Sequence, residues 1–167
     1  MLRLISRTST RVESSTSFPE IEEYVAGFGG FEWNILDEHP DRILVQTKDI
    51  VELRRFDKTS SNWEKSEIRS YLNGSFKTNN FSTEEVGQIL GDVFLLDRQE
   101  VENYLKTPNS RIALFEGKRR NWWLRSSGYH SHRAACVYPD GDVGDAGRNV
   151  GFGDGGVRPA LWLKTSR

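Results

Sequence analysis

The sequence predicts a single α+β domain, with helices in the first two thirds of the chain and strands and long irregular loops in the last third. Apolar residues recur at helical spacing before Thr107, and this period disappears after it. The last third instead holds short apolar runs separated by Gly-rich stretches. A chain of 167 residues is long enough to bury one core. We therefore expect a flexible leader over residues 1–17 and one domain over residues 18–167.

The first elements after the leader are short. Residues 18–26 fit either a helix or a strand and end in a flexible Gly-Phe-Gly-Gly sequence. Residues 31–36 and 42–46 are rich in apolar side chains, and residues 37–41 between them contain the Pro and Asp residues that suit a turn. This pair of segments is predicted to form a hairpin.

The middle of the chain carries the helical pattern. Ser82 and Asp97 are good N-caps, because a short polar side chain accepts hydrogen bonds from the free N–H groups at the start of a helix. The pair Asn73-Gly74 predicts a helix end, because Gly readily takes the left-handed conformation found there. Helices are expected at residues 62–72, 82–90 and 97–105, with a short strand at residues 92–96.

The last third is predicted to form strands. Pro159 removes a backbone donor from the final strand, so that strand should lie at an edge or carry a bulge. Helices and strands that are segregated along the chain favour α+β over a doubly wound sheet. The strands are expected at residues 112–115, 122–125, 134–138 and 157–163.

Composition narrows the choice of partner. A net charge of -1 gives no general attraction to nucleic acid, and no apolar run reaches the 18 residues of a membrane span. The N-terminus lacks the apolar core of a secretory signal, which leaves the localisation open. The single cysteine, Cys136, excludes an intrachain disulfide. We therefore expect neither nucleic-acid binding nor membrane insertion.

One window of the chain has an unusual composition. Residues 127–156 contain no Glu, Lys, Gln, Met or Trp, although the other positions hold 14 Glu, 7 Lys and 3 Gln. That density predicts about five Glu, Lys or Gln residues in a window of this length. Eight of the 15 glycines also lie in this window. Something other than ordinary surface chemistry has selected these side chains.

Four valines at positions 137, 143, 150 and 157 recur at intervals of six or seven residues, which suggests irregular segments that are each fixed to the core by one valine. The residues between them are then expected to face solvent, where aromatic and Arg side chains on a rigid frame provide contact area for binding. The alternative is a Gly-rich surface loop without a binding role. The expected solvent-facing residues are Tyr129, His130, His132, Arg133, Tyr138, Asp142, Asp145, Arg148, Asn149, Phe152 and Asp154.

Familiar catalytic and metal motifs are not supported. Residues 151–156 match G-x-G-x-x-G, but a dinucleotide site needs a strand before the motif and a helix after it. His130, His132 and Cys136 share strand parity, yet Cys136 is roughly 13 Å from His132 in an extended chain, too far for one zinc ion. The acids at 140, 142 and 145 lack the calcium-loop spacing. We therefore expect no catalytic residue, no metal site and no cofactor.

Several short blocks of the chain form a recognisable set, and the two that contain Trp122-Trp123 and Trp162 are its most specific parts. The blocks are Trp33-Asn34-Ile35-Leu36, residues 43–49, Trp63-Glu64, residues 66–73, Phe76, Phe81-Ser82, residues 92–96, 122–126 and 157–163. Over about residues 31–163 the chain resembles an uncharacterised bacterial and viral family, similar to the variable proteins of diversity-generating retroelements. The resemblance implies a C-type lectin-like fold.

The resemblance also implies a cause for the unusual window. In that class an error-prone reverse transcriptase rewrites adenines of a template, typically in Asn codons, and the copy replaces the C-terminal coding region. Randomising the two adenines of such a codon cannot give Glu, Gln, Lys, Met or Trp, the set that is missing here. Leu, Ile and Thr are missing too, although this mechanism permits them, and a Gly-rich window by itself depletes long side chains.

Carried over by position, the resemblance divides the window and its borders into three groups. The implied framework residues are Trp122, Trp123, Arg125, Val157, Arg158 and Trp162. The implied variable, ligand-binding residues are Tyr129, His130, His132, Arg133, Cys136, Tyr138, Asp142, Asp145, Arg148, Asn149, Phe152 and Asp154. Further exchangeable positions are Pro139, Gly144, Ala146, Gly151, Gly153 and Gly155.

The implied function is a non-enzymatic, receptor-type binding protein that displays a hypervariable surface to a macromolecular ligand, a protein on a cell or virion surface. The chain lacks the disulfides and the Glu-Pro-Asn or Gln-Pro-Asp loop of calcium-dependent sugar-binding lectins, and it lacks the cysteine pair of formylglycine-generating enzymes. Two alternatives stay open: an enzyme of the formylglycine-generating or metal-dependent type, and a structural segment of a viral tail.

Overall fold

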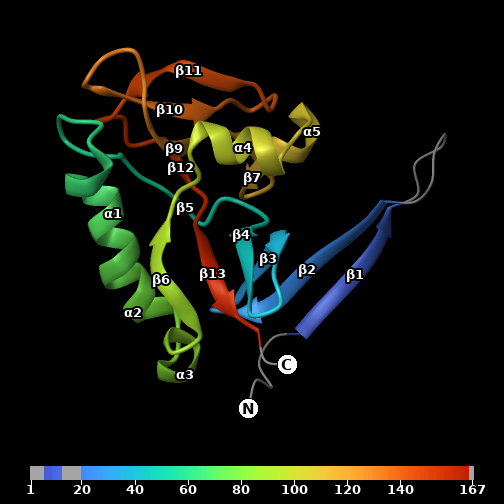
Figure 1. Cartoon of the computed structure of the whole chain (residues 1–167). Helices are drawn as coiled ribbons and strands as arrows, with labels where there is room; N and C mark the ends of the chain where they lie inside the picture. Colours follow the sequence, from blue (N-terminus) through green and yellow to red (C-terminus); the bar gives the residue numbers. More distant parts are fainter. Residues whose placement is uncertain (1–5, 13–19, 166–167) are drawn as a thin grey trace.

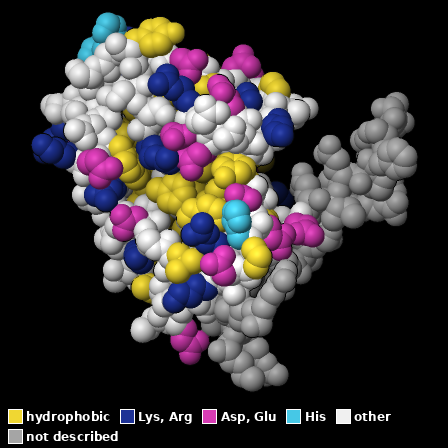
Figure 2. Space-filling model, viewed as in Figure 1, with side chains coloured by type: hydrophobic (Ala, Val, Ile, Leu, Met, Phe, Trp, Pro, Cys, Tyr) yellow, Lys and Arg dark blue, Asp and Glu magenta, His cyan; other side chains and the backbone are white. Residues whose placement is uncertain are grey.

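The chain folds into two main β-sheets that are joined by short helices, as a computed structural model shows (Figure 1). The structure describes residues 6–12 and 20–165. Strands hold 41% of the residues, about twice the share of the helices. Lys and Arg side chains are interspersed with Asp and Glu over the face shown in Figure 2, in keeping with the small net charge.

The larger sheet has six antiparallel strands in the order β1-β2-β3-β4-β13-β6. The predicted hairpin is confirmed as β3 and β4, in which Trp33 lies opposite Thr47. Ile43 and Val45 point to the same face of β4, because side chains alternate along a strand, and both pack into the main core. The strands are β1 (Ser6–Val12), β2 (Glu20–Phe28), β3 (Phe31–Glu38), β4 (Arg42–Thr47), β13 (Ala160–Lys164) and β6 (Ile89–Phe94).

The smaller sheet has five strands in the order β11-β10-β9-β12-β5, so β11 is an edge strand. Its strand β9 separates two apolar clusters: Trp123 packs into the main core, whereas Trp122 and Leu124 pack into a second core with Val101. The strands are β11 (Val143–Asn149), β10 (Arg133–Val137), β9 (Trp122–Ser127), β12 (Gly156–Val157) and β5 (Glu52–Leu53), beside a two-stranded sheet of β7 (Ala113–Phe115) and β8 (Lys118–Arg120).

The helices are short and lie in the middle of the chain. The predicted caps are confirmed, because Ser82 with Glu85 and Asp97 with Glu100 each form a capping box. The helical elements are η1 (Trp63–Lys65), α1 (Glu67–Tyr71), η2 (Leu72–Phe76), α2 (Lys77–Asn80), α3 (Thr83–Val86), α4 (Arg98–Tyr104) and α5 (Pro108–Arg111).

The predicted helix end at Asn73-Gly74 is confirmed in part, and the one at Leu90 is wrong. The helix is interrupted at Gly74, whose φ of -108° and ψ of -107° are not helical, but helical turns resume beyond this kink and run to Asn80. The Asn73 side chain instead accepts a hydrogen bond from the backbone N–H of Val93 at 2.8 Å and donates one to the Val93 carbonyl at 3.0 Å. This long-range contact with β6 holds the turn against the sheet. The second helix ends at Val86 because β6 begins at Ile89 and needs those residues for pairing.

The predicted α+β distribution is also wrong, and with it the C-type lectin-like arrangement of helices in the first two thirds and strands in the last third. Strands occupy both ends of the chain and the helices lie between them. The reason is long-range pairing: β13, at the C-terminal end, inserts between β4 and β6 of a sheet that otherwise comes from the first part of the chain. Of the expected leader, Ser6–Val12 forms β1, and residues 1–5 and 13–17 lie outside the described residues.

The C-terminal segment joins the two sheets. The two-residue strand β12 pairs with β9 and β5, and β13, three residues further on, pairs with β4 and β6. Pro159 lies between them. The pairing of β13 with β6 shifts register between Ala160 and Trp162, which agrees with the bulge predicted next to Pro159. None of the helices in the described part of the chain is long and apolar enough to cross a membrane.

Candidate ligand-binding surface

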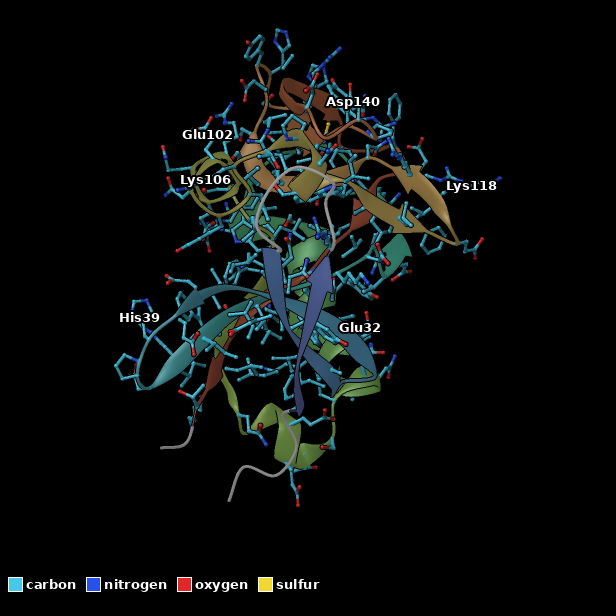
Figure 3. The ribbon with its side chains drawn as sticks, turned by 90° about the vertical axis from the view of Figure 1, so that its right-hand side faces the viewer. Glu32, His39, Glu102, Lys106, Lys118 and Asp140 are labelled. Carbon is cyan, nitrogen blue, oxygen red and sulfur yellow. The ribbon has the colours of Figure 1, made fainter. Side chains whose placement is uncertain are left out.

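The unusual window forms β10, β11 and their loops, at one end of the molecule (Figure 1). In the turned view, Asp140 of the β10–β11 turn lies at this end, whereas Glu32 in β3 and His39 just after it lie well below (Figure 3). The valines at 137, 150 and 157 are fully buried, in agreement with their predicted role as fixed points, and Val143 is partly buried. The window is therefore attached to the core at regular intervals.

Four of the implied framework residues, Trp122, Trp123, Val157 and Arg158, are buried beneath this end of the molecule. The indole N–H of Trp123 donates to the Arg54 carbonyl at 2.9 Å and that of Trp122 to the Arg111 carbonyl at 2.9 Å. These bonds satisfy the polar atoms of two buried aromatic rings. Trp162 is only partly buried, and it lies in β13 of the larger sheet.

Arg158 is buried to 1% exposure next to Trp122. Its Nε donates to the Thr47 carbonyl at 2.8 Å, its Nη2 donates to the Lys48 carbonyl at 3.0 Å, and its guanidinium lies 4.9 Å from the centre of the Trp122 ring. Burial lowers the pKa of Arg158 to about 10. This residue therefore joins the two sheets and is not available to a ligand.

Arg125, the half-buried framework residue, fixes helix α4 beside the window. Its Nη1 donates to the Leu95 carbonyl at 2.8 Å and also binds Glu100, and its Nη2 donates to Asp97 at 2.9 Å. Asp97 and Glu100 are the two members of the α4 capping box. The start of α4 is thus held by a charge-assisted network.

The exposed aromatic residues are concentrated in the window. Among the described residues, the large hydrophobic side chains that are exposed are Tyr129 at 73%, Phe152 at 51% and Tyr138 at 38%. All three lie within residues 127–156. Exposed aromatic rings on a fixed frame are typical of binding surfaces.

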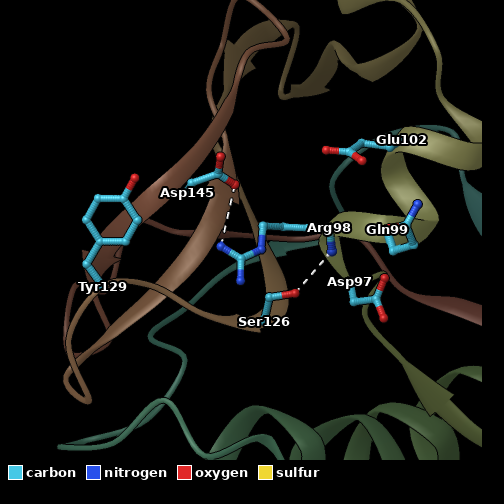
Figure 4. Close-up of a pocket in the computed structure, with 7 residues that line it drawn as sticks. All are labelled: Asp97, Arg98, Gln99, Glu102, Ser126, Tyr129 and Asp145. Carbon is cyan, nitrogen blue, oxygen red and sulfur yellow. Dashed lines mark hydrogen bonds and ion pairs between the residues drawn. The ribbon is translucent and has the colours of Figure 1, made fainter.

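Tyr129 and Asp145 meet helix α4 around an open hollow of about 500 Å³ (Figure 4). The Arg98 guanidinium of α4 lies 3.5 Å from the Asp145 carboxylate. The backbone N–H of Arg98 donates to the Ser126 hydroxyl at 3.0 Å. The hollow is lined by Asp97, Arg98, Gln99, Glu102, Ser126, Tyr129 and Asp145.

A second group of candidates surrounds Arg148. Its Nη1 donates to the Asn121 side chain at 2.7 Å, and its Nη2 donates to both Asp154 carboxylate oxygens at 3.0 and 3.2 Å. The guanidinium lies 5.8 Å from the centre of the Trp123 ring and 5.4 Å from that of Phe152. Arg148 therefore contacts two other implied variable residues, Phe152 and Asp154. It also contacts Asn121 and Trp123, which lie outside that set.

The two groups lie on opposite sides of the edge strand β11. Asp145 faces α4, which packs on the side of Trp122 and Leu124. Arg148 faces Trp123, which points to the other side of β9. The candidates thus wrap around the edge of the smaller sheet and do not share one flat face.

The remaining candidates lie along the β9–β10 and β10–β11 loops and at the end of β11. The exposed rings of His130 and His132 stack at 5.5 Å with an interplanar angle of 15°. The Tyr138 ring covers Gly144, which has no side chain to obstruct it. Asp142 and Asn149 are exposed.

Arg133 is partly buried in β10, and its Nη1 donates to the Gly147 carbonyl at 3.3 Å. A second hollow touches the β9–β10 loop at Ser131 and is lined by Ser60, Ser61, Asn62, Trp63, Arg125, Ser127 and Ser131. Within the described residues, no group of three or more His, Cys, Asp or Glu side chains is placed to hold a metal ion.

The prediction that Cys136 belongs to the surface is wrong. Cys136 is fully buried in the main core, opposite Trp123 of β9 and Gly144 of β11. Ala134 and Cys136 are two residues apart in β10, so both side chains point to the core side of the strand. Burial also raises the pKa of the Cys136 thiol to about 11.

The prediction that Gly155 is exchangeable is also wrong. Gly155 is buried, and a Cβ atom added there would collide with the Trp123 indole. Gly153 has open space around the same position and remains compatible with exchange. Gly155 is therefore a framework residue, because Trp123 packs where its side chain would be.

Sequence reasoning missed the residues that helix α4 contributes to the hollow. Arg98, Gln99 and Glu102 lie about 45 residues before Asp145, and they approach it only because α4 packs against the smaller sheet. The Asp97 cap predicts the start of this helix but not what it contacts. Only the tertiary structure supplies that information.

A comparison with known proteins gives a family but no function. No curated protein and no solved structure matches the chain. The model of one family, described as a domain of unknown function (DUF6273), matches residues 40–93 and 82–165, which include helix α4, the window and both Trp-rich borders. The chain therefore belongs to the DUF6273 family.

Proposed function

We propose that the chain is a non-enzymatic ligand-binding protein whose exposed window side chains form a hypervariable surface, as in the variable proteins of diversity-generating retroelements. One observation carries the proposal. All three exposed large hydrophobic side chains among the described residues fall in the 30-residue window that lacks Glu, Gln, Lys, Met and Trp. Those five residue types are the ones that adenine replacement in Asn codons cannot produce.

The division between frame and surface supports the same proposal. Trp122, Trp123 and Val157 are fully buried, whereas Tyr129, His130 and Phe152 are exposed. Side chains that do not contribute to the core can be exchanged at little cost to stability. A buried frame of this kind permits a surface to change while the fold is kept.

The partner that suits this surface is a macromolecule, and we propose a protein on a cell or virion surface. Aromatic and Arg side chains dominate the binding energy of protein interfaces when they fill pockets on the partner. The window offers three exposed aromatic residues and Arg148 around one edge strand. Affinity is then set by which of them find complementary pockets.

An enzyme of the formylglycine-generating type would need a reactive thiol. The only thiol of the chain is buried in the main core, and this burial raises its pKa. A reactive cysteine needs a lowered pKa and access to solvent. The position of Cys136 therefore favours the binding function over this alternative.

The deciding experiment for diversification is sequencing of the DNA around the gene, together with the same gene in sister genomes. We expect a reverse-transcriptase gene and an imperfect repeat of codons 127–156 that carries adenines at the codons of exposed residues. Substitutions between sister genomes should cluster at those codons. Substitutions spread evenly along the gene, without a repeat, would sink the proposal.

A second experiment tests whether the surface can be exchanged. The triple variant Tyr129→Ser, His130→Asn, His132→Asn should keep its melting temperature within about 3 °C of the original, because all three side chains are exposed. The comparison variant Trp123→Ala should lower the free energy of unfolding by about 3–5 kcal/mol, because it removes a fully buried side chain. A triple variant that unfolds as readily as Trp123→Ala would show that the window is structural.

A further inference from the structure

The loop between β11 and β12 is fixed at both ends by the frame. At its start, Val150 is fully buried and its N–H donates to the His132 carbonyl at 3.0 Å. At its end, the Gly155 carbonyl accepts from the Arg54 N–H at 2.9 Å. Residues 151–154 between these points are exposed. Their position depends on contacts made in the middle of the loop.

Asn149 accepts hydrogen bonds from the N–H groups of Gly151 and Phe152, and the contacts of the Phe152 and Asp154 side chains are made by Arg148. Arg148 is 18% exposed, and its guanidinium is bonded on one side to Asn121 and on the other to both carboxylate oxygens of Asp154. The Phe152 ring lies 5.4 Å from the same guanidinium. One side chain therefore ties two residues of the exposed segment to the frame, through a forked geometry that Lys cannot reproduce.

We propose that Arg148 is a positioning residue that holds residues 151–154 and presents Phe152 as an apolar anchor, so that positions 148, 152 and 154 act as one unit. The inference rests on the proposed binding function for the role of Phe152. Arg148 is then a positioning residue and no longer a residue that contacts the ligand. It can be exchanged only together with Phe152 and Asp154.

The chemistry of this unit indicates the part of the partner that it meets. Phe152 is 51% exposed and lies over a guanidinium whose charge is paired with Asp154. A ring over a neutralised ion pair offers an apolar surface of little conformational freedom. It fits an apolar pocket on a protein partner better than a charged group.

Cys136 provides a reporter that needs no ligand. It is the only thiol of the chain, it is fully buried, and it lies in β10 two residues from Ala134, which pairs with Arg148 of β11. Burial raises the pKa of this thiol and the Arg148 charge lowers it, so loss of the charge alone would slow labelling, and faster labelling must come from increased access. Loss of the Arg148 side chain should open the side of the smaller sheet that covers this thiol. Labelling of the thiol by Ellman's reagent then reports release of the loop.

The experiment uses the full chain without a partner. Arg148→Ala should speed hydrogen exchange at the N–H groups of Gly151 and Phe152, which donate to Asn149, and labelling of Cys136 by about tenfold, the effect of losing a charged hydrogen-bond pair. Asp154→Asn should speed exchange at the same two N–H groups by a smaller factor. The double variant should behave like Arg148→Ala alone, because both changes remove one interaction.

Asp145→Asn is the matched control. It removes the other ion pair of β11, with Arg98 on the opposite side of the strand, and should leave both rates unchanged. The proposal is overturned by unchanged exchange in Arg148→Ala, by additive effects in the double variant, or by an equal rise in the control. If Arg148→Ala fails to fold by circular dichroism, unchanged exchange in Asp154→Asn, which alters an exposed residue, overturns it. These outcomes are independent of whether a retroelement diversifies the gene.

Discussion

At the scale of single residues, burial controls the chemistry of Cys136. Burial raises the pKa of this thiol from its ordinary value near 9 to about 11. Because the folded protein disfavours the thiolate, this group contributes stability that is fully present below about pH 9. That contribution is lost as the pH rises through about 11.

The variant Cys136→Ala tests this dependence, since it removes the titrating group and keeps a small apolar side chain. Between about pH 9 and 11, the free energy of unfolding of the original chain should fall by about 2 kcal/mol more than that of the variant. Urea denaturation at several pH values measures the difference. The tyrosines and lysines titrate in both proteins and cancel. Parallel curves for the two proteins would contradict the burial of this thiol.

The glycines of the β11–β12 loop differ in what they permit. At Gly155 a Cβ atom would meet the Trp123 indole, whereas at Gly153 it would meet open space. Gly155→Ala should therefore lower the free energy of unfolding by about 1–3 kcal/mol through overpacking. Gly153→Ala should change it by no more than about 0.5 kcal/mol. Thermal unfolding compares the two, and equal losses would contradict the close packing of Gly155 on Trp123.

At the scale of elements, the Arg125 guanidinium ties the capping box of helix α4 to the smaller sheet. Arg125 bonds to both members of the capping box, Asp97 and Glu100, and to the Leu95 carbonyl. The guanidinium of Arg98, at the first turn of the same helix, makes an exposed ion pair with Asp145 at 3.5 Å. The two arginines therefore differ in what they hold, although both lie next to the hollow.

Replacing each arginine by alanine separates these roles. Arg125→Ala should lower the free energy of unfolding by about 2 kcal/mol, because it leaves two carboxylates without their charged partner. It should also speed hydrogen exchange at residues 98–104. Arg98→Ala should change stability by less than about 0.5 kcal/mol, the effect of an exposed ion pair. Similar losses from both variants would show that Arg125 does not anchor the helix.

At the scale of the whole molecule, the two sheets share one stretch of chain. Strands β12 and β13 are separated by two residues, and they pair in different sheets. The buried Arg158 lies between them and bonds to the carbonyls of Thr47 and Lys48 at the end of β4. Opening either sheet disturbs the strand that completes the other.

We therefore expect one cooperative unfolding transition. Native-state hydrogen exchange in low urea should give the same free energy of unfolding for Arg42–Thr47 of the larger sheet and Arg133–Val137 of the smaller one. Two distinct free energies, with the window sheet opening first, would show that the sheets are independent. In that case β12 and β13 would not couple them.

Local sequence patterns were sufficient to predict the positions of some helices and strands. The turn between residues 37 and 41 predicts the β3–β4 hairpin, and the caps at Ser82 and Asp97 predict the starts of α3 and α4. Each of these depends on bonds between residues close in sequence. Asn73 shows the limit, because its side chain is used for a contact with Val93, 20 residues away.

The sequence by itself determined the unusual composition of residues 127–156 and the valines that fix them to the core. These features follow from which side chains occur and at what spacing. The tertiary structure alone decided that β13 lies between β4 and β6, that Cys136 and Gly155 are buried, and that the candidates wrap around β11 beside α4. Strand order and register depend on pairing between distant segments, and hydrophobic periodicity within one segment carries no information about its partner.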